Sequence, residues 1–215
     1  MSVKGVSSSH LIQQFPLKEV KQAIRLILRS WESFKTKVNW EDKITNKFYA
    51  HLIEDKSRST YYFTIVPRPA EIDEQGEEIG EIDLKVIYRN QEKTYFSFEC
   101  KRLRVHFSSG FETLAGKYVT EGMYRYFDGR YARDLDKGGM LGYVMDGNIE
   151  EAIEDIQKAV EKRRSNLYMQ ENETLKASSC ITSKQVKETT HKYGPNERFT
   201  IYHIFLPMNI VPINN

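Results

Sequence analysis

The chain has 215 residues, of which 40% are apolar and 29% charged, so it is long enough for one globular domain with its own hydrophobic core. The formal net charge of +2 is almost neutral, so the total charge does not indicate a nucleic-acid-binding protein, although a local basic surface is compatible with it. Two cysteines are too few for a zinc site, and neither a signal-peptide pattern nor an apolar run of about 18 residues is present, so we expect a soluble cytoplasmic protein that does not enter a membrane.

Two helices are predicted in the first quarter of the chain. Pro16 is suited to the first turn of a helix, and apolar residues then recur on one helical face. They are Val20, Ile24, Ile27 and Leu28. Asn39 is the predicted N-cap of the second helix, whose buried stripe contains Ile44, Phe48 and Leu52. Glu41 lies three residues before Ile44, which places it at the end of the same stripe.

Three strands follow as an antiparallel meander. Residues 61–66 predict the first strand, and an acidic loop then extends to Glu78. From Gly80 the pattern has a period of two, which turns alternate apolar residues toward the core and Asp83 away from it. The third strand alternates in the same way. It places Phe96, Phe98 and Cys100 in the core, and Tyr95, Ser97, Glu99 and Lys101 on the opposite face.

The rest of the chain alternates between helices and strands. We expect a helix over residues 111–127, a short apolar strand within 138–147, and an amphipathic helix capped by Asn148. Residues 170–198 are polar without a clear period and predict a long loop, and residues 199–206 predict a final strand. The fold class is therefore α/β.

Two carboxylates are predicted to face each other across the hairpin. A turn that pivots at Gln91 pairs Asp83 with Glu99, with Cβ atoms about 5 Å apart. Such a pair is repulsive, and a divalent cation with oxygen ligands removes the repulsion. In the alternative interpretation these charges lie on the solvated face of the hairpin, where a salt bridge from Lys101 is worth about 0–1 kcal/mol.

The functional interpretation is a metal site on two adjacent strands. Asp83, Glu99 and the main-chain carbonyl of Cys100 are the candidate ligands. Lys101 is the candidate group that orients the attacking water or helps to deprotonate it. A cation held there would polarise a phosphodiester and stabilise the departing oxygen.

The sequences GEID, at residues 80–83, and FECK, at residues 98–101, resemble the bipartite motif of the PD-(D/E)XK nuclease superfamily. That motif often has Pro before the Asp, where this chain has Ile82. The resemblance implies a restriction-endonuclease-like core of helix, three-stranded antiparallel meander, helix and strand, with an added N-terminal helix and a C-terminal helix plus strand. We therefore divide the chain into an N-terminal helical extension, residues 1–38, and a nuclease domain, residues 39–215.

The resemblance also implies the chemistry and further site residues. It implies a Mg²⁺- or Mn²⁺-dependent endonuclease that acts on DNA, with RNA as the alternative substrate. An acid of the first core helix is expected to complete the site. Glu41 is our choice because it shares the apolar stripe of that helix, and Glu54 is the alternative.

Four basic residues are candidates for contacts with the nucleic-acid backbone. Lys117 and Arg125 follow the lysine motif in a predicted helix, which in similar nucleases lies close to the scissile phosphate. Arg102 and Arg104 continue the basic end of the motif strand. The alternatives are helical salt bridges to Glu121, worth about 0.2–0.5 kcal/mol each, and a solvated strand end.

Residues 117–132 and 138–144 are also similar to small nuclease subunits of prokaryotic anti-phage defence operons. This similarity implies an effector that a larger ATPase partner controls. Cutting both strands with one small site needs two copies, so a homo-oligomer is expected. The competing hypothesis is a non-catalytic assembly subunit with a nuclease-like fold, because the charge is near neutral and the polar segment 171–198 could order on a partner.

Overall fold

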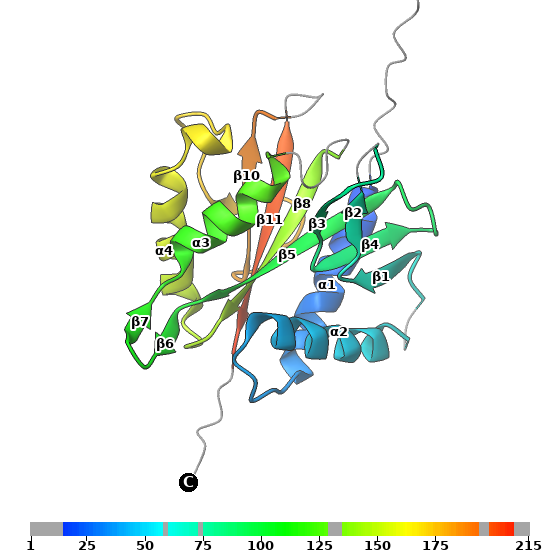
Figure 1. The fold of residues 1–215 in the computed structure, drawn as a ribbon, viewed down its shortest axis with the longest axis horizontal. Helices are drawn as coiled ribbons and strands as arrows, with labels where there is room; N and C mark the ends of the chain where they lie inside the picture. Colours follow the sequence, from blue (N-terminus) through cyan, green and yellow to red (C-terminus); the bar gives the residue numbers. More distant parts are fainter. Residues whose placement is uncertain (1–14, 58–59, 73–74, 129–134, 194–197, 209–215) are drawn as a thin grey trace, which may run out of the picture.

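The computed structural model describes residues 15–57, 60–72, 75–128, 135–193 and 198–208. The fold is mixed α/β, with a seven-stranded sheet between two layers of helices (Figure 1). Helices α1 (Leu17–Ser33) and α2 (Glu41–Ser57) pack on one face of the sheet. The other face is covered by α4 (Ile149–Glu161) and by a shorter helical segment that begins with α3 (Ala115–Lys117). Within the described residues, none of the helices combines the length and apolar character that crossing a membrane requires.

Seven strands form the sheet in the order β1-β4-β5-β8-β11-β10-β9. Strand β8 is parallel to both of its neighbours, and the other pairs are antiparallel. The strands are β1 (Phe63–Pro67), β4 (Leu84–Tyr88), β5 (Tyr95–Leu103), β8 (Lys137–Val144), β9 (Lys176–Ala177), β10 (Val186–His191) and β11 (Phe199–Pro207). Two hairpins lie outside the sheet. They consist of β2 (Ala70–Ile72) with β3 (Glu78–Glu81), and β6 (Val105–Phe107) with β7 (Gly110–Glu112).

Both N-terminal helices form where the apolar spacing predicts them. Pro16 directly precedes the first residue of α1, and Val20, Ile24 and Ile27 are buried. Helix α2 begins at Glu41, and its first backbone hydrogen bond runs from the amide of Ile44 to the carbonyl of Trp40. Trp40 therefore takes the capping position expected for Asn39. Helix α1 packs into the same core as the sheet, and the division at residue 38 stays a prediction.

The predicted register of the central hairpin is confirmed. Leu84 pairs with Phe98, and Val86 pairs with Phe96, as a turn centred on Gln91 requires. The amide of Tyr88 closes the turn by donating to the carbonyl of Thr94 at 3.0 Å. Asp83 lies one residue before β4, so this register brings it to the part of β5 that carries Glu99 and Cys100.

The polar face of β5 is not solvated, contrary to the alternative interpretation of the hairpin. Ser97 and Glu99 are fully buried, and Lys101 is 9% exposed. The reason is that helices cover both faces of the sheet (Figure 1), so an alternating pattern does not here separate core from solvent. Other protein groups must therefore stabilise the charges of Glu99 and Lys101. The chemistry of the site then depends on which groups these are.

Strand β8 is buried along its whole length, and two of its glycines make room for aromatic rings. A Cβ atom on Gly138 would lie 2.4 Å from the ring of Tyr126, and one on Gly139 would lie 2.4 Å from the ring of Phe98. The two rings approach from opposite faces of the sheet. The apolar strand expected within residues 138–147 is thus confirmed, and its glycines serve close packing.

Three predicted segments differ from the structure. The expected loop over residues 170–198 contains β9 and β10, and the acidic loop before Glu78 contains β2. Buried Glu188, Thr189 and His191 gave β10 a polar pattern, which hid a core strand. For β10 the missing signal is a set of buried hydrogen-bond partners elsewhere in the chain, whereas β2 pairs locally with β3 in a short hairpin.

The helix predicted over residues 111–127 is shorter and irregular. Phe111 lies in β7, and Leu114 adopts a left-handed conformation (φ 56°) just before α3 begins at Ala115. The segment continues as a π-helix, η1 (Tyr118–Gly122), and a 3-10 helix, η2 (Met123–Tyr126). The expected closing residue, Gly129, lies outside the described residues. An extra residue in a π-turn shifts the faces of a helix, so the even spacing of Lys117, Glu121 and Arg125 does not persist.

Candidate active site

The structure brings four of the sequence-predicted residues together at the carboxyl-terminal half of β5. Glu41 comes from the first turn of α2, Asp83 from the residue just before β4, and Glu99 and Lys101 from β5. All four line a cavity of about 220 Å³. Glu54 lies at the other end of α2 and lines none of the cavities described for the chain, so Glu41 is the helix acid at the site.

The ammonium group of Lys101 lies at the centre of the cluster. Its Nζ donates to Glu99 Oε1 at 2.7 Å, to the carbonyl oxygen of Cys100 at 3.0 Å and to Glu41 Oε1 at 3.2 Å. Burial lowers the pKa of Lys101, but the charges of Glu99, Glu41 and Asp83 outweigh burial and raise this pKa above its usual value. Lys101 is therefore an ammonium ion at neutral pH.

Glu99 is the most enclosed acid of the cluster, because its side chain has no exposed surface. A second cation approaches it from η2, where Arg125 Nη1 lies 3.0 Å from Glu99 Oε1 and 3.1 Å from Oε2. Arg125 was expected to contact nucleic acid. The structure places it against Glu99 on the wall of the same cavity, and its contact with nucleic acid stays a prediction.

Asp83 is held by the main chain of the facing strand. Its Oδ2 accepts a hydrogen bond from the amide of Cys100 at 2.7 Å. Burial and the negative charge of Glu99 raise the pKa of Asp83 to about 7, against the opposing effects of Lys101 and of this hydrogen bond. The repulsion predicted from the hairpin register is thus present in the folded protein.

Glu41 connects the helix to the edge of β5. Its Oε1 accepts from Lys101, and its Oε2 accepts from the amide of Arg102 at 2.8 Å. Three carboxylates (Glu41, Asp83 and Glu99) therefore surround two cations (Lys101 and Arg125). When Asp83 is ionised, this cluster has one more negative than positive charge, which suits a further cation.

The predicted metal ligands stand together, but protein groups bind several of their oxygens. Lys101 donates hydrogen bonds to Glu99 Oε1 and to the carbonyl of Cys100, and the amide of Cys100 donates one to Asp83 Oδ2. In the described part of the chain, no three or more His, Cys, Asp or Glu side chains form a group that could hold a metal ion. A cation at these ligands therefore requires the ammonium of Lys101 to move off Glu99.

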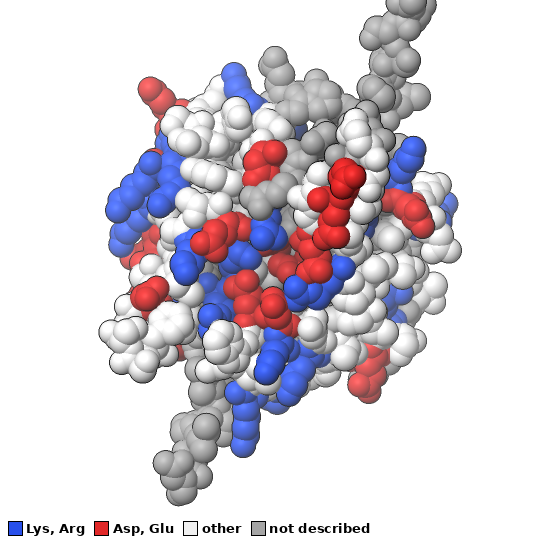
Figure 2. All heavy atoms as spheres, in the orientation of Figure 1, with Lys and Arg blue, Asp and Glu red and all other residues white. Residues whose placement is uncertain are grey.

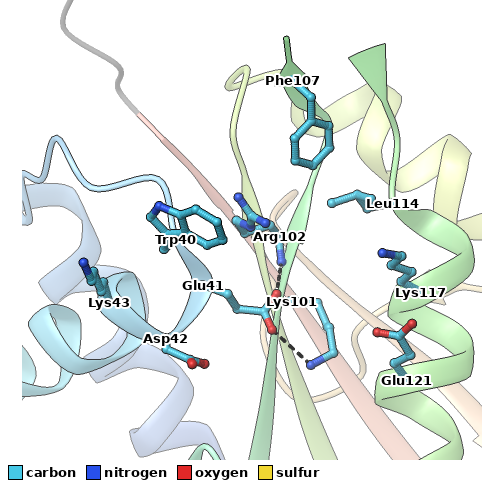
Figure 3. Close-up of a pocket in the computed structure, with 10 residues that line it drawn as sticks. All are labelled: Trp40, Glu41, Asp42, Lys43, Lys101, Arg102, Phe107, Leu114, Lys117 and Glu121. Atoms are coloured by element: carbon cyan, nitrogen blue, oxygen red, sulfur yellow. Dashed lines mark hydrogen bonds and ion pairs between the residues drawn. The ribbon is translucent and has the colours of Figure 1, made fainter. Parts of the chain in front are cut away.

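A larger groove of about 490 Å³ adjoins the cluster and shares Glu41 and Lys101 with it (Figure 3). Of the predicted phosphate contacts, Arg102 and Lys117 line this groove. In Figure 2, acidic and basic side chains gather together on the face where β5 passes between α2 and α3. The charges of this face are mixed, in accord with the near-neutral total.

Arg104 does not belong to the site. Its guanidinium donates to Asp146 and Asp155, at 2.7 Å each, and also to Glu151. It lines neither the cavity nor the groove. Arg104 directly follows the end of β5 and has a positive φ of 57°. This backbone conformation turns its side chain to the face of the sheet opposite to the one that strand alternation predicts.

Sequence reasoning missed several residues around the site. Arg68 pairs with Asp42 at 3.2 Å and bonds Glu81 at 2.7 Å on the cavity wall, and the rings of Trp40 and Phe107 border the groove. Trp40 is next to Glu41 in the sequence, and this position was the signal that could have identified it as a residue near the site. The exposure of these rings depends on how α2 and the β6–β7 hairpin are placed.

No protein-family model, curated protein or solved structure matches this chain. The assignment of a function therefore rests on the site itself.

Proposed function

We propose that this protein is a Mg²⁺- or Mn²⁺-dependent endonuclease that hydrolyses phosphodiester bonds in DNA, on a restriction-endonuclease-like core. The observation that carries the proposal is the convergence of Glu41, Asp83, Glu99 and Lys101 in one cavity with excess negative charge. The order of elements supports it, because α2, the antiparallel strands β1, β4 and β5, the α3 segment and β8 follow one another as in that core.

Each residue of the cluster has a role that its position supports. Asp83, Glu99 and the carbonyl of Cys100 are the proposed metal ligands, and a bound cation supplies Lewis acidity toward the phosphodiester. Lys101 donates hydrogen bonds to Glu99 and Glu41, so its proposed role is to orient the attacking water or help to deprotonate it. Glu41 and Arg125 hold Lys101 and Glu99 in place.

Plasmid cleavage with and without Mg²⁺ tests the proposal. Glu99→Gln and Lys101→Ala are each expected to lower the rate by at least about 100-fold, as loss of a group that stabilises developing charge does. Glu54→Gln is the matched control, because it removes the other glutamate considered in α2 at a position away from the cavity. Metal-dependent cleavage that survives in Glu99→Gln would contradict the proposal.

A non-catalytic assembly subunit is the second candidate, because Lys101 occupies oxygens that a metal needs. Calorimetric titration with Mn²⁺ separates the two functions. If the protein is a nuclease, wild type binds Mn²⁺, Asp83→Asn binds it more weakly, and Lys101→Met binds it more tightly because the competing ammonium is gone. An absence of binding in all three proteins, or equal binding in all three, favours the assembly subunit.

We also propose that the protein acts in the cytoplasm as a homo-oligomeric effector of an anti-phage defence complex with a larger ATPase partner. The similarity of residues 117–132 and 138–144 to small defence nucleases supports this role. Light scattering of the purified protein measures its oligomeric state. A monomer at micromolar concentration, both with and without DNA, would contradict the homo-oligomer.

A further inference from the structure

Two exposed aromatic rings border the groove beside Lys101. Trp40 is 65% exposed and Phe107 is 36% exposed. Trp40 directly precedes α2, whereas Phe107 ends β6, so two distant parts of the chain bring their rings to one groove (Figure 3). Exposed aromatic surface that gathers in a groove marks a binding surface more often than an isolated exposed ring does.

The guanidinium of Arg102 extends between the two rings. Its central carbon lies 5.7 Å from the ring centroid of Trp40 and 5.8 Å from that of Phe107. Arg102 Nη1 donates to the carbonyl of Asn39 at 2.7 Å, which fixes the side chain in this position. Two rings and a planar cation therefore offer flat surfaces on which other planar groups can stack.

The groove also carries positive charge that its acids offset only in part, since Glu41, Asp42 and Glu121 line it beside four basic residues. Glu41 is already bound by Lys101 and by the amide of Arg102, and Asp42 is paired with Arg68. The two remaining lysines of the groove are Lys43 and Lys117. Among the described residues, neither has an ion-pair partner, so both are available to phosphate groups.

We propose that this groove binds the unpaired bases of a single-stranded nucleic acid, which stack on Trp40 and Phe107 while Lys43 and Lys117 contact its phosphates. Bases expose their flat faces only when they are unpaired, and aromatic rings with basic residues beside them are how proteins hold such strands. The inference rests on the proposed nuclease function, since it assigns the substrate class of that site. The groove shares Glu41 and Lys101 with the cavity, so a strand bound in the groove runs toward Glu99 in the cavity.

Fluorescence anisotropy in EDTA measures this binding without cleavage. The probes are a labelled oligo-dT, an abasic oligomer of the same length and a duplex of the same length. We expect wild type to prefer oligo-dT over the abasic oligomer and over the duplex. Trp40→Ala is expected to weaken oligo-dT binding by about 5- to 150-fold, the effect of losing one stacked base, while leaving abasic binding unchanged.

Tyr62→Ala is the matched control, since Tyr62 is 53% exposed but does not line the groove. We expect it to bind oligo-dT like wild type, and circular dichroism checks that both variants are folded. Wild type that binds the abasic oligomer or the duplex as tightly as oligo-dT, or does not bind oligo-dT, overturns the inference. Wild-type affinity in Trp40→Ala does the same.

Failure of this inference and failure of the nuclease function give different results. Plasmid cleavage together with unchanged oligo-dT binding in Trp40→Ala overturns the stacking site and leaves the nuclease in place. Stacking-dependent binding by a protein that cleaves neither plasmid nor circular single-stranded DNA in Mg²⁺ or Mn²⁺ overturns the nuclease and leaves the groove as a site for single strands.

Discussion

Replacing Lys101 with Met tests whether the lysine ammonium holds the buried charges of the site. The side chain of Glu99 has no exposed surface, and that of Lys101 is 11% exposed, so water cannot solvate Glu99 once its partner is removed. Removing one partner of a buried ion pair costs about 3–5 kcal/mol. Arg125 remains 3.0 Å from Glu99, so we expect the lower end of that range, about 3 kcal/mol of the free energy of unfolding.

Urea denaturation followed by circular dichroism measures this loss in wild type, Lys101→Met, Glu99→Gln and the double variant. The Gln amide removes the charge that the ammonium neutralised, so the double variant is expected to recover most of the stability lost in Lys101→Met. The coupling between the two changes is expected to exceed about 1 kcal/mol. A Lys101→Met variant within about 0.5 kcal/mol of wild type, the range of surface substitutions, would refute the buried pair.

Three further predictions concern the rest of the fold. Burial lowers the pKa of His191 from its usual 6.5 to about 4 and that of His203 to about 3, so below pH 6.5 the unfolded chain binds protons that the folded protein does not, and stability falls as the pH falls. Each histidine should contribute a loss of about 2 kcal/mol between about pH 7.5 and pH 5, measured by urea titration in Asp83→Asn, a background that removes the opposite contribution of the raised Asp83 pKa; equal stability at both pH values would contradict this. Gly139→Ala should cost about 1–3 kcal/mol in the same urea assay, because its Cβ would meet the ring of Phe98, and a neutral outcome would show that the ring can move. Arg104→Ala should lower stability by roughly 2 kcal/mol because it leaves three carboxylates together, but it should not change oligo-dT affinity, and weaker binding would return Arg104 to the site.

The register of the central hairpin could be predicted because it depends on local rules. Alternation of apolar residues sets which face is buried, and a turn centred on Gln91 then pairs Asp83 with the neighbourhood of Glu99. Glu41 could be chosen over Glu54 for a similar reason, since only the first turn of α2 continues the buried stripe toward β5. The register argument needs only the period of a strand and the geometry of a turn, whereas the expectation of an acid in this helix comes from the resemblance to the nuclease superfamily.

Strand β10 could not be predicted, because its polar residues are satisfied by partners elsewhere in the chain. The Thr189 hydroxyl lies 2.7 Å from His191 Nε2 and 2.9 Å from His203 Nε2, and His203 Nδ1 in turn lies 3.0 Å from the hydroxyl of Tyr118. These groups are buried only because they bond one another. In sequence they are indistinguishable from a solvated loop.

The sequence by itself determined the elements with a clear period, the pairing of the hairpin and the approach of Asp83 to Glu99, because each follows from contacts between near neighbours. Only the tertiary structure decided which partner each charge has. It placed the ammonium of Lys101 on the oxygens expected to bind metal, turned Arg125 to Glu99, and held Arg104 among three acids. Such long-range partners depend on how α2, α4 and the α3 segment pack on the sheet, and the spacing of residues along one element does not contain that arrangement.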